Sequence, residues 1–255
     1  MSLLAAIASS RRRSTAFSPL SLSPALWLDA SDASTLWDAT SGGSLVASNG
    51  AIARWEDKSG NAKHALQTTA ANRPLRKIGI KNGMDTVRFD GINDGLQVAS
   101  ITLPTYITAY VIQRSDFSSS NLKFWFEHGA NVNNFSGCFF NGMNSGAWAF
   151  TRDGAYHSGP SSDGQDWSGV NWILATLKYD GIGSFYKNGN LVSNTSHLGT
   201  SRANSNLTEK LNIGCRNLSS LFLSGDIAEM LIYPSVHSDV NKSLVETYLT
   251  SKWLI

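Results

Sequence analysis

Two short clusters of acidic and amide side chains offer the hard oxygen ligands that calcium prefers. The first cluster is Asp90, Asn93 and Asp94, and the second is Asp29, Asp32 and Asp38. The same residue types also form turns, because Asp and Asn bond to their own backbone and tolerate left-handed conformations. Neither cluster completes a calcium-loop motif, and the ligand spacing of a zinc site is absent from the sequence. We therefore expect turns here, with no metal and no other cofactor, and keep calcium at Asp90, Asn93 and Asp94 as the alternative.

The acidic residues do not follow a catalytic pattern. Glycoside hydrolysis uses two carboxylates, and an E-x-D-x-E string along one strand would place both on the same face. No such string occurs, and the adjacent Glu56 and Asp57 would point to opposite sides of a strand. A G-x-S-x-G elbow, a phosphate-binding P-loop and a dinucleotide-binding fingerprint are also absent from the sequence. We expect a protein that is not an enzyme; a hydrolase with a dispersed active site is a remote alternative.

Histidine and cysteine are scattered rather than clustered. Five single histidines are expected to be ordinary surface or hydrogen-bonded side chains: His64, His128, His157, His197 and His237. The two cysteines, Cys138 and Cys215, fall on different predicted strands. Without an export signal, two reduced and buried thiols are expected.

Eight tryptophans suggest binding of sugars, because an exposed indole is a platform for a sugar ring. Six of them fall within apolar runs and are predicted to belong to the core: Trp27, Trp55, Trp125, Trp148, Trp172 and Trp253. Three other aromatic residues stand in polar surroundings. If the protein binds a glycan, Trp167, Tyr156 and Trp37 are the residues predicted to contact it.

Residues 1–23 differ from the rest of the chain and are predicted to form an extended arm. A short apolar stretch precedes three arginines, and a Ser- and Pro-containing run follows them. A secretory signal would have its charges before a longer apolar segment, so we expect no export signal. The few apolar groups of this segment cannot by themselves offset the entropy cost of ordering it, roughly 1–2 kcal/mol per residue. A neighbouring protein surface is therefore the expected partner of the arm. The predicted anchors are Arg11, Arg12, Arg13, Phe17, Leu20 and Leu22.

Length and composition predict one domain rich in strands. A chain of 255 residues can bury one sizeable core. With 21 basic and 19 acidic residues, the near-neutral charge disfavours nucleic acid as a partner. No run approaches the ~20 apolar residues of a membrane-spanning helix, and we expect no membrane association.

Short apolar runs separated by Gly, Ser and Asn mark the strands that position these residues. Asn188 and Gly189 form a predicted hairpin turn, since both tolerate positive φ. The predicted strands are Thr86–Phe89, Leu96–Val98, Tyr106–Ile112, Lys123–His128, Gly137–Asn141, Trp148–Thr151, Trp172–Tyr179, Ser184–Lys187, Leu211–Gly214 and Ile227–Tyr233.

The last strand and a terminal helix follow one another. Alternation places Ile227, Glu229, Leu231 and Tyr233 on one face of the strand and Ala228, Met230 and Ile232 on the other. Pro234 ends the strand, and Ser238 with Asp239 supplies an N-cap and a charge suited to the helix dipole. The helix is predicted to lie against the sheet through Val240, Leu244, Val245, Tyr248 and Trp253.

Four strings in sequence order resemble the laminin-G-like family of concanavalin A-like sandwiches. They are ALWLDASDASTL with WEDKSGNAKHALQ, then VRFDGINDGL, then WILATLKYDGIGSFYKNGNLV, and lastly the strand and helix at the carboxyl end. Together they cover most of residues 24–253. The resemblance implies an all-β antiparallel jelly roll over residues 24–255, preceded by the arm and ending in a short helix.

The resemblance also extends to members of the family carried by bacteriophages, which implies a structural role. The expected protein is a capsid cement or decoration protein that is made in the host cytoplasm and located in the virion. Its arm would bind the major capsid protein, with several copies around a junction between capsomers. The alternative is a carbohydrate-binding module on a tail fibre or receptor-binding protein.

Overall fold

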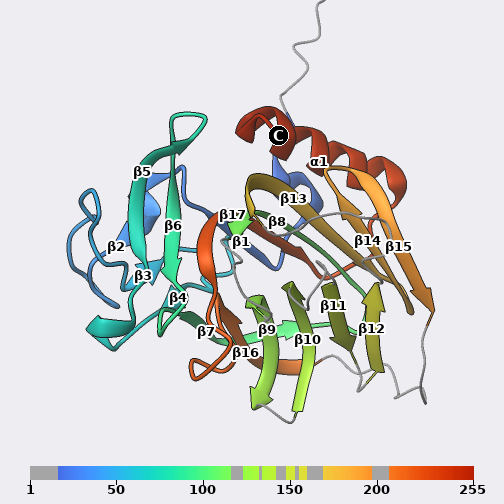
Figure 1. The fold of residues 1–255 in the computed structure, drawn as a ribbon, viewed down its shortest axis with the longest axis horizontal. Helices are drawn as coiled ribbons and strands as arrows, with labels where there is room; N and C mark the ends of the chain where they lie inside the picture. Colours follow the sequence, from blue (N-terminus) through green and yellow to red (C-terminus); the bar gives the residue numbers. More distant parts are fainter. Residues whose placement is uncertain are drawn as a thin grey trace, which may run out of the picture.

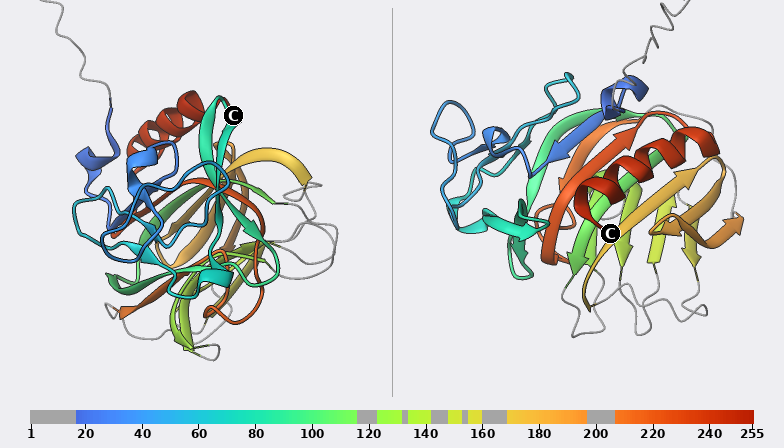
Figure 2. Two further views of the ribbon diagram at one scale, coloured as in Figure 1. Left: turned by 90° about the vertical axis from the view of Figure 1, so that its left-hand side faces the viewer. Right: turned by 90° about the horizontal axis from the view of Figure 1, so that it is seen from above.

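The computed structural model describes residues 17–115, 123–131, 134–141, 148–152, 155–159, 169–196 and 207–255. Its side chains are described for residues 17–115, 123–129, 171–192 and 208–255. Two antiparallel sheets pack face to face, and a C-terminal helix covers the outer side of one of them (Figures 1 and 2). The predicted all-β sandwich with a short terminal helix is confirmed.

The first sheet has the order β15-β14-β13-β8-β17-β6-β5, and β1 also pairs with β17. Its strands are β1 (Leu26–Asp29), β5 (Leu75–Lys81), β6 (Met84–Asp90), β8 (Ile107–Ser115), β13 (Gly169–Tyr179), β14 (Ile182–Lys187), β15 (Asn190–Ser196) and β17 (Ser224–Tyr233). The hairpin between β14 and β15 turns at Asn188 and Gly189, whose φ angles are 49° and 82°. The predicted turn is therefore confirmed.

The second sheet has the order β12-β11-β10-β9-β16-β7-β4-β3-β2. Its strands are β2 (Leu36–Trp37), β3 (Arg54–Trp55), β4 (Ala65–Leu66), β7 (Leu96–Leu103), β9 (Lys123–Asn131), β10 (Asn134–Asn141), β11 (Trp148–Arg152), β12 (Ala155–Gly159) and β16 (Leu207–Ile213). Short 3-10 turns complete the described elements: η1 (Pro19–Leu22), η2 (Ala33–Thr35) and η3 (Ala70–Asn72).

Two apolar layers hold these elements together. The larger lies between the sheets and contains Trp55 and Trp125, both fully buried. The smaller lies between the first sheet and α1 (Asp239–Trp253), where Trp27 and Trp253 are buried and Trp172 is partly buried. Five of the six tryptophans predicted for the core therefore pack in one layer or the other. The side chain of the sixth, Trp148, lies outside the described ones.

A β-bulge in β17 corrects the predicted faces of that strand. The register with β8 shifts between Ile227 and Glu229, so Ala228 is the extra residue. Ile227 consequently packs between the sheets with Met230, whereas Ala228 packs under α1 with Leu231. Strict alternation predicts the reverse, with Ile227 on the side of Leu231 and Ala228 on the side of Met230.

The helix begins as predicted, but only part of its predicted face meets the sheet, because Val245, Tyr248 and Trp253 pack there and Val240 and Leu244 do not. Ser238 caps it by accepting a hydrogen bond from the Asn241 amide at 3.2 Å. Val245 and Trp253 are buried, as expected, but Val240 and Leu244 are 70% and 42% exposed. Their places are taken by the charged side chains of Lys242, 8% exposed, and Glu246, 7% exposed.

Lys242 and Glu246 can be buried because they neutralise each other one turn apart. Their ion pair measures 2.7 Å, and Glu246 also accepts a hydrogen bond of 2.9 Å from the Thr176 hydroxyl. The Lys242 ammonium lies 4.0 Å from the centre of the Tyr186 ring. Charge pairing and a cation–π contact thus replace the apolar contacts that the helical period predicted.

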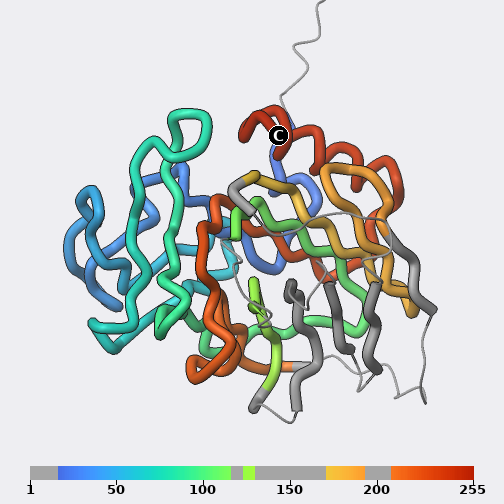
Figure 3. The backbone as a smooth tube through the Cα atoms, viewed as in Figure 1, coloured from blue at the N-terminus to red at the C-terminus, as the bar shows by residue number. Residues whose placement is uncertain are grey.

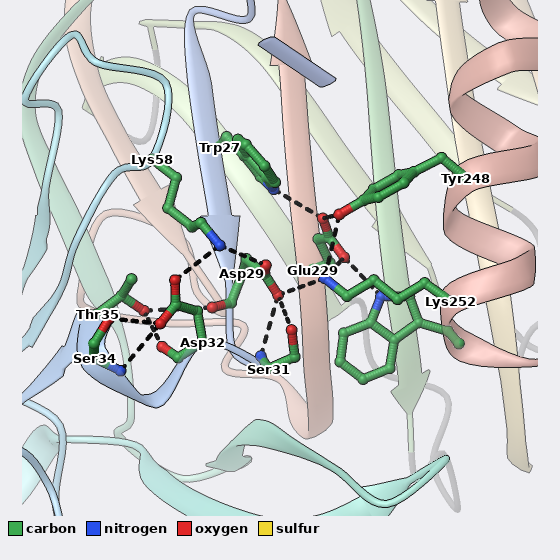
Figure 4. Close-up of polar contacts among 11 residues, drawn as sticks. Trp27, Asp29, Ser31, Asp32, Ser34, Thr35, Lys58, Glu229, Tyr248 and Lys252 are labelled. Atoms are coloured by element: carbon green, nitrogen blue, oxygen red, sulfur yellow. Dashed lines mark hydrogen bonds and ion pairs between the residues drawn. The ribbon is translucent and has the colours of Figure 1, made fainter. Parts of the chain in front are cut away.

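A second buried charge network joins β1, β17 and α1 (Figure 4). The Lys252 ammonium lies 2.8 Å from Asp29 and 2.7 Å from Glu229. Lys58 adds ion pairs of 2.9 Å to Asp29 and to Asp32. Two lysines therefore face three carboxylates where the amino-terminal turns meet the helix.

Glu229 is at the centre of this network and is fully buried. Besides Lys252, it accepts hydrogen bonds from Trp27 at 2.8 Å, Tyr248 at 3.0 Å and Trp253 at 2.7 Å. Burial and the neighbouring Asp29 charge raise the pKa of Glu229, and the Lys252 charge opposes this rise. Burial alone would also raise the pKa of Asp29, but Lys252 and its hydrogen bonds hold that pKa below its ordinary value.

Removing Lys252 should therefore be strongly destabilising. We expect Lys252→Met to lower the free energy of unfolding by about 3–5 kcal/mol, because it leaves two buried carboxylates without their shared cation. Urea unfolding followed by tryptophan fluorescence measures the change. Lys178→Met is the matched control, since the Lys178–Asp239 pair spans 3.7 Å and Asp239 is 88% exposed; it should cost less than about 1 kcal/mol. Equal losses in the two variants would contradict a special role for the buried network.

Candidate binding face

One residue from each strand of the second sheet lies in a single row across that sheet. The pairing register runs through Trp37, Arg54, Leu66, Gln97, Asn212, Glu127, Cys138, Thr151 and Tyr156. Directly paired residues of antiparallel strands share a face. The flanking pairs, Trp55 with Ala65 and Leu96 with Ile213, belong to the layer between the sheets. The row therefore lies on the outer face of the second sheet.

Two of the predicted glycan-contacting residues are the ends of this row. Trp37 lies on β2 and Tyr156 on β12, which are the two edge strands. Eight strand spacings of ~4.8 Å separate them by roughly 38 Å. Residues this far apart in one register row do not converge in a single pocket. The third residue, Trp167, lies outside the described residues.

The middle of the row is a chain of hydrogen bonds. Gln97 donates to Asn212 at 2.6 Å, and Asn212 donates to Glu127 at 3.0 Å. The connection after β16 covers this part, since the Asn217 amide donates to Glu127 at 2.7 Å and Arg216 lies 3.3 Å from the same carboxylate. Burial raises the pKa of Glu127, while these donors oppose the rise. Gln97, by contrast, is partly exposed.

The Trp37 end of the row is more open. The indole is partly exposed, and the Arg54 guanidinium lies 4.8 Å from its ring centre. Arg54 is fixed by Glu56 at 3.1 Å and by the carbonyl groups of Ala39 and Gly42 at 3.2 and 3.3 Å. Arg54 itself is only 8% exposed, so the preordered indole of Trp37 is the part of this end that can stack on a sugar ring.

The row could be found in the sequence only in part. Trp37 and Tyr156 stood out as aromatic residues in polar surroundings. Asn212 and Glu127 did not stand out as candidate site residues. An isolated polar residue within a predicted strand indicates only that one face of the strand is not apolar. Their connection depends on β7, β9 and β16 being neighbours, which is long-range information.

The described carboxyl groups with raised pKa values are structural. Glu127, Glu229 and Asp94 are at most 5% exposed. Each also accepts a hydrogen bond from a donor within the fold. A general acid must touch its substrate, so burial deprives these three groups of that role in the described conformation.

The first predicted calcium cluster forms a turn closed by its own hydrogen bonds. One Asp90 oxygen accepts from the amides of Ile92, Asn93 and Asp94 at 2.8, 3.1 and 3.2 Å. Asp94 in return accepts from the Asp90 amide at 3.0 Å. Burial, with the Asp90 charge, raises the pKa of Asp94 to about 6. These carboxylates therefore serve as turn-forming acceptors.

The second cluster is divided between lysines and backbone amides. Asp29 and Asp32 pair with Lys58, as described above, and Asp38 accepts from the Ser44 amide at 2.7 Å. Within the part of the chain that the structure describes, no group of three or more His, Cys, Asp or Glu side chains is placed to hold a metal ion.

The histidines and cysteines whose side chains are described play structural roles. His64 accepts from the Asp57 amide at 3.1 Å, buried His128 lies 3.0 Å from the Ile101 carbonyl, and His237 lies 2.8 Å from the Tyr110 hydroxyl. Burial lowers the pKa of His237 to about 4. The thiol of Cys215 is free and buried. The side chains of His157, His197 and Cys138 lie outside those described.

The end of the predicted arm packs on its own chain. Phe17 and Leu22 contact the apolar layer beneath α1, and the Phe17 ring lies 6.1 Å from the Tyr248 ring. Leu20 is 48% exposed. Arg11, Arg12 and Arg13 lie outside the described residues. Two of the six predicted anchors are thus already used within the molecule.

Among the described residues, no helix is both long enough and apolar enough to cross a membrane. No family model matches the sequence, and no curated protein matches it. Solved structures nevertheless show the same architecture.

One similar structure is domain 4 of AbnA, a GH43 extracellular arabinanase of Geobacillus stearothermophilus, in complex with arabinotriose. Its TM-score is 0.56 at 12% identity, over 74% of this chain and 91% of that domain. Another is the receptor binding domain of botulinum neurotoxin D, with a TM-score of 0.55 at 13% identity over 90% of this chain and 54% of that one. Trypanosoma rangeli sialidase matches with a TM-score of 0.54 at 14% identity, over 81% of this chain and 32% of the enzyme.

These likenesses show the fold alone. Sequence identities of 12–14% are too low to carry a conclusion about function. The chain spans about half of the toxin domain and a third of the sialidase, but most of the arabinanase domain. They agree with the predicted concanavalin A-like sandwich.

The turn at Asp94 gives a pH-dependent prediction. Its folded pKa of about 6 lies above the unfolded value, so its contribution to stability is full below about pH 4 and is lost as the pH rises through 6. Asp94→Asn keeps an acceptor for the Asp90 amide and should be more stable than the wild type by about 1 kcal/mol at pH 7.5, with solvent screening allowed for, and equally stable at pH 4. Urea unfolding at both pH values tests this.

Calcium serves as the control in the same experiment. A millimolar calcium salt should leave the wild-type midpoint unchanged, because one carboxylate oxygen of Asp90 and one of Asp94 are already used by backbone amides of the turn. A calcium-dependent rise that Asp94→Asn abolishes would instead establish an ion site.

Proposed function

We propose that this chain is a non-enzymatic carbohydrate-binding module whose ligand lies along the outer face of the second sheet. The observation that carries the proposal is the part of the cross-strand row that stays partly exposed, from the Trp37 indole to the Gln97 amide on one face. Three strand spacings of ~4.8 Å separate these two residues by roughly 14 Å, which suits a short oligosaccharide better than a single sugar.

The similar structures support this class of function. The arabinanase domain was solved in complex with arabinotriose, and the botulinum neurotoxin D domain is a receptor binding domain. Both are sandwiches that recognise a ligand outside the domain. Sialidase is an enzyme, but the chain covers only 32% of it, and the buried carboxylates described above favour binding over hydrolysis.

Within the row, we assign different tasks to its exposed parts. Trp37 provides the stacking platform, and buried Arg54 holds the indole in place. Gln97, three strands away in the same row, provides amide hydrogen bonds, since it is partly exposed and oriented by Asn212. Buried Glu127 orients Asn212 rather than touching the ligand.

A glycan array followed by calorimetry on the best ligand tests the proposal. Trp37→Ala should weaken binding at least about tenfold, equivalent to about 1.4 kcal/mol, and Gln97→Ala should weaken it less. Tyr106→Ala is the matched control, because Tyr106 is an exposed aromatic residue, 39% accessible, that lies off the row. Thermal unfolding verifies that all three variants fold.

Two results would overturn the assignment: an array without any bound glycan, or an equal loss in the Tyr106→Ala variant. Chromatography of the incubated ligand distinguishes binding from catalysis, because a module returns the oligosaccharide intact.

The virion role stays a prediction from the sequence. Attachment to a major capsid protein, several copies around a capsomer junction and location in the virion all depend on the arm, whose arginines lie outside the described residues. Carbohydrate binding and the virion role are compatible, because a binding module could lie at the surface of a particle. Labelling of purified particles with an antibody against this chain would test the virion role.

A further inference from the structure

A groove of about 880 Å³ runs along the outward side of α1. Val240, Leu244 and Tyr248 form one wall at helical spacing, and Phe17 forms another. Val240 is 70% exposed and Leu244 is 42% exposed. The stripe is therefore apolar surface that the described part of the chain leaves open to solvent. Covering this apolar stripe is favourable, because it removes apolar area from water.

The groove lies where the undescribed amino-terminal segment begins. Phe17 is the first described residue, and its ring packs edge-on against Tyr248. Figure 3 shows that the described chain begins close to α1. The 16 residues before it contain one apolar stretch, Leu3–Ile7. The nine intervening residues can span at most ~30 Å, and α1, with 15 residues, is about 22 Å long. The stretch can therefore reach any part of the groove.

Charge distinguishes the two ends of the groove. Asp239, at the start of α1, has a side chain that is 88% exposed, with Lys178 at 3.7 Å. Lys252, at the other end, is neutralised by Asp29 and Glu229. The exposed Asp239 carboxylate at the edge of an apolar floor complements a segment in which three arginines follow an apolar stretch. Arg11–Arg13 and Leu3–Ile7 stand in that order.

We propose that Leu3–Ile7 of the same chain docks in this groove, with Arg11–Arg13 near Asp239. A short tether gives the segment an effective concentration in the millimolar range, so weak contacts are sufficient. The docked segment covers the apolar stripe of α1 and keeps the arm against its own sandwich. Another protein that binds the arm must first displace it.

Disulfide trapping in the full-length chain tests the proposal. Leu4→Cys is combined with Leu244→Cys in a Cys138→Ser background; Cys215 does not interfere, because it is fully buried and burial raises its pKa to about 12. Under mild oxidation, a disulfide within one chain should form at least about tenfold faster than in the control pair of Leu4→Cys with Ile92→Cys, an exposed position in the turn after β6. Mass spectrometry and non-reducing gels identify the product.

The disulfide products show whether the groove is occupied by the arm of the same chain or by the arm of a second copy. Equal rates in the two pairs would overturn docking in the groove. A disulfide mainly between two chains would assign the groove to the arm of a second copy and overturn docking within one chain.

Limited trypsin digestion of the intact protein provides a second measurement. Docking should slow cleavage at Arg11–Arg13, so Leu4→Asp and Leu244→Asp should each raise the cleavage rate several-fold. Ile92→Asp, which places the same charge on another exposed apolar position, should leave the rate unchanged. Equal rates in all four proteins would overturn the proposal.

Discussion

A fully buried carboxylate, Glu229, determines how the separate parts of this fold meet. Ionised carboxylates are expensive to bury unless every oxygen is paired, and Glu229 obtains its four donors from two elements that are far apart in the sequence. Trp27 comes from β1, whereas Tyr248, Lys252 and Trp253 come from α1. If either the amino-terminal strand or the helix left the first sheet, the Glu229 carboxylate would keep only part of its hydrogen-bond donors. The network therefore specifies one docking position for both, which apolar contacts alone would define less sharply.

The bulge in β17 is part of the same arrangement. Upstream of it, Asp226 is held by Arg88 at 2.8 Å and Arg114 at 2.6 Å on the outer face of the first sheet. The extra residue, Ala228, changes the phase of the strand, so that Glu229 also points to the helix side. With uninterrupted alternation, Asp226 and Glu229 would lie on opposite faces. One inserted residue thus allows two buried carboxylates to serve the same face.

The sequence predicts those features that depend on local chemistry. The hairpin at Asn188 and Gly189, the N-cap at Ser238 and most strands follow from turn preferences and apolar runs. It fails where a partner distant in sequence changes the meaning of a residue. Lys242 and Glu246 look like a solvated helix face until Thr176 and Tyr186 are placed beside them. Trp37 and Tyr156 look like candidates for one pocket until the order of nine strands separates them.

The helix α1 carries two apolar stripes, one against the sheet and one along the groove. Val245, Leu249 and Trp253 are buried against the sheet, while Val240, Leu244 and Tyr248 line the groove, so apolar residues follow the helical period on two sides. A helix needs one such stripe to dock. The second stripe has no structural task in the described part of the chain, and Tyr248 connects it to Glu229 through its hydroxyl. One side chain, Tyr248, therefore belongs both to the lining of the groove and to the central charge network.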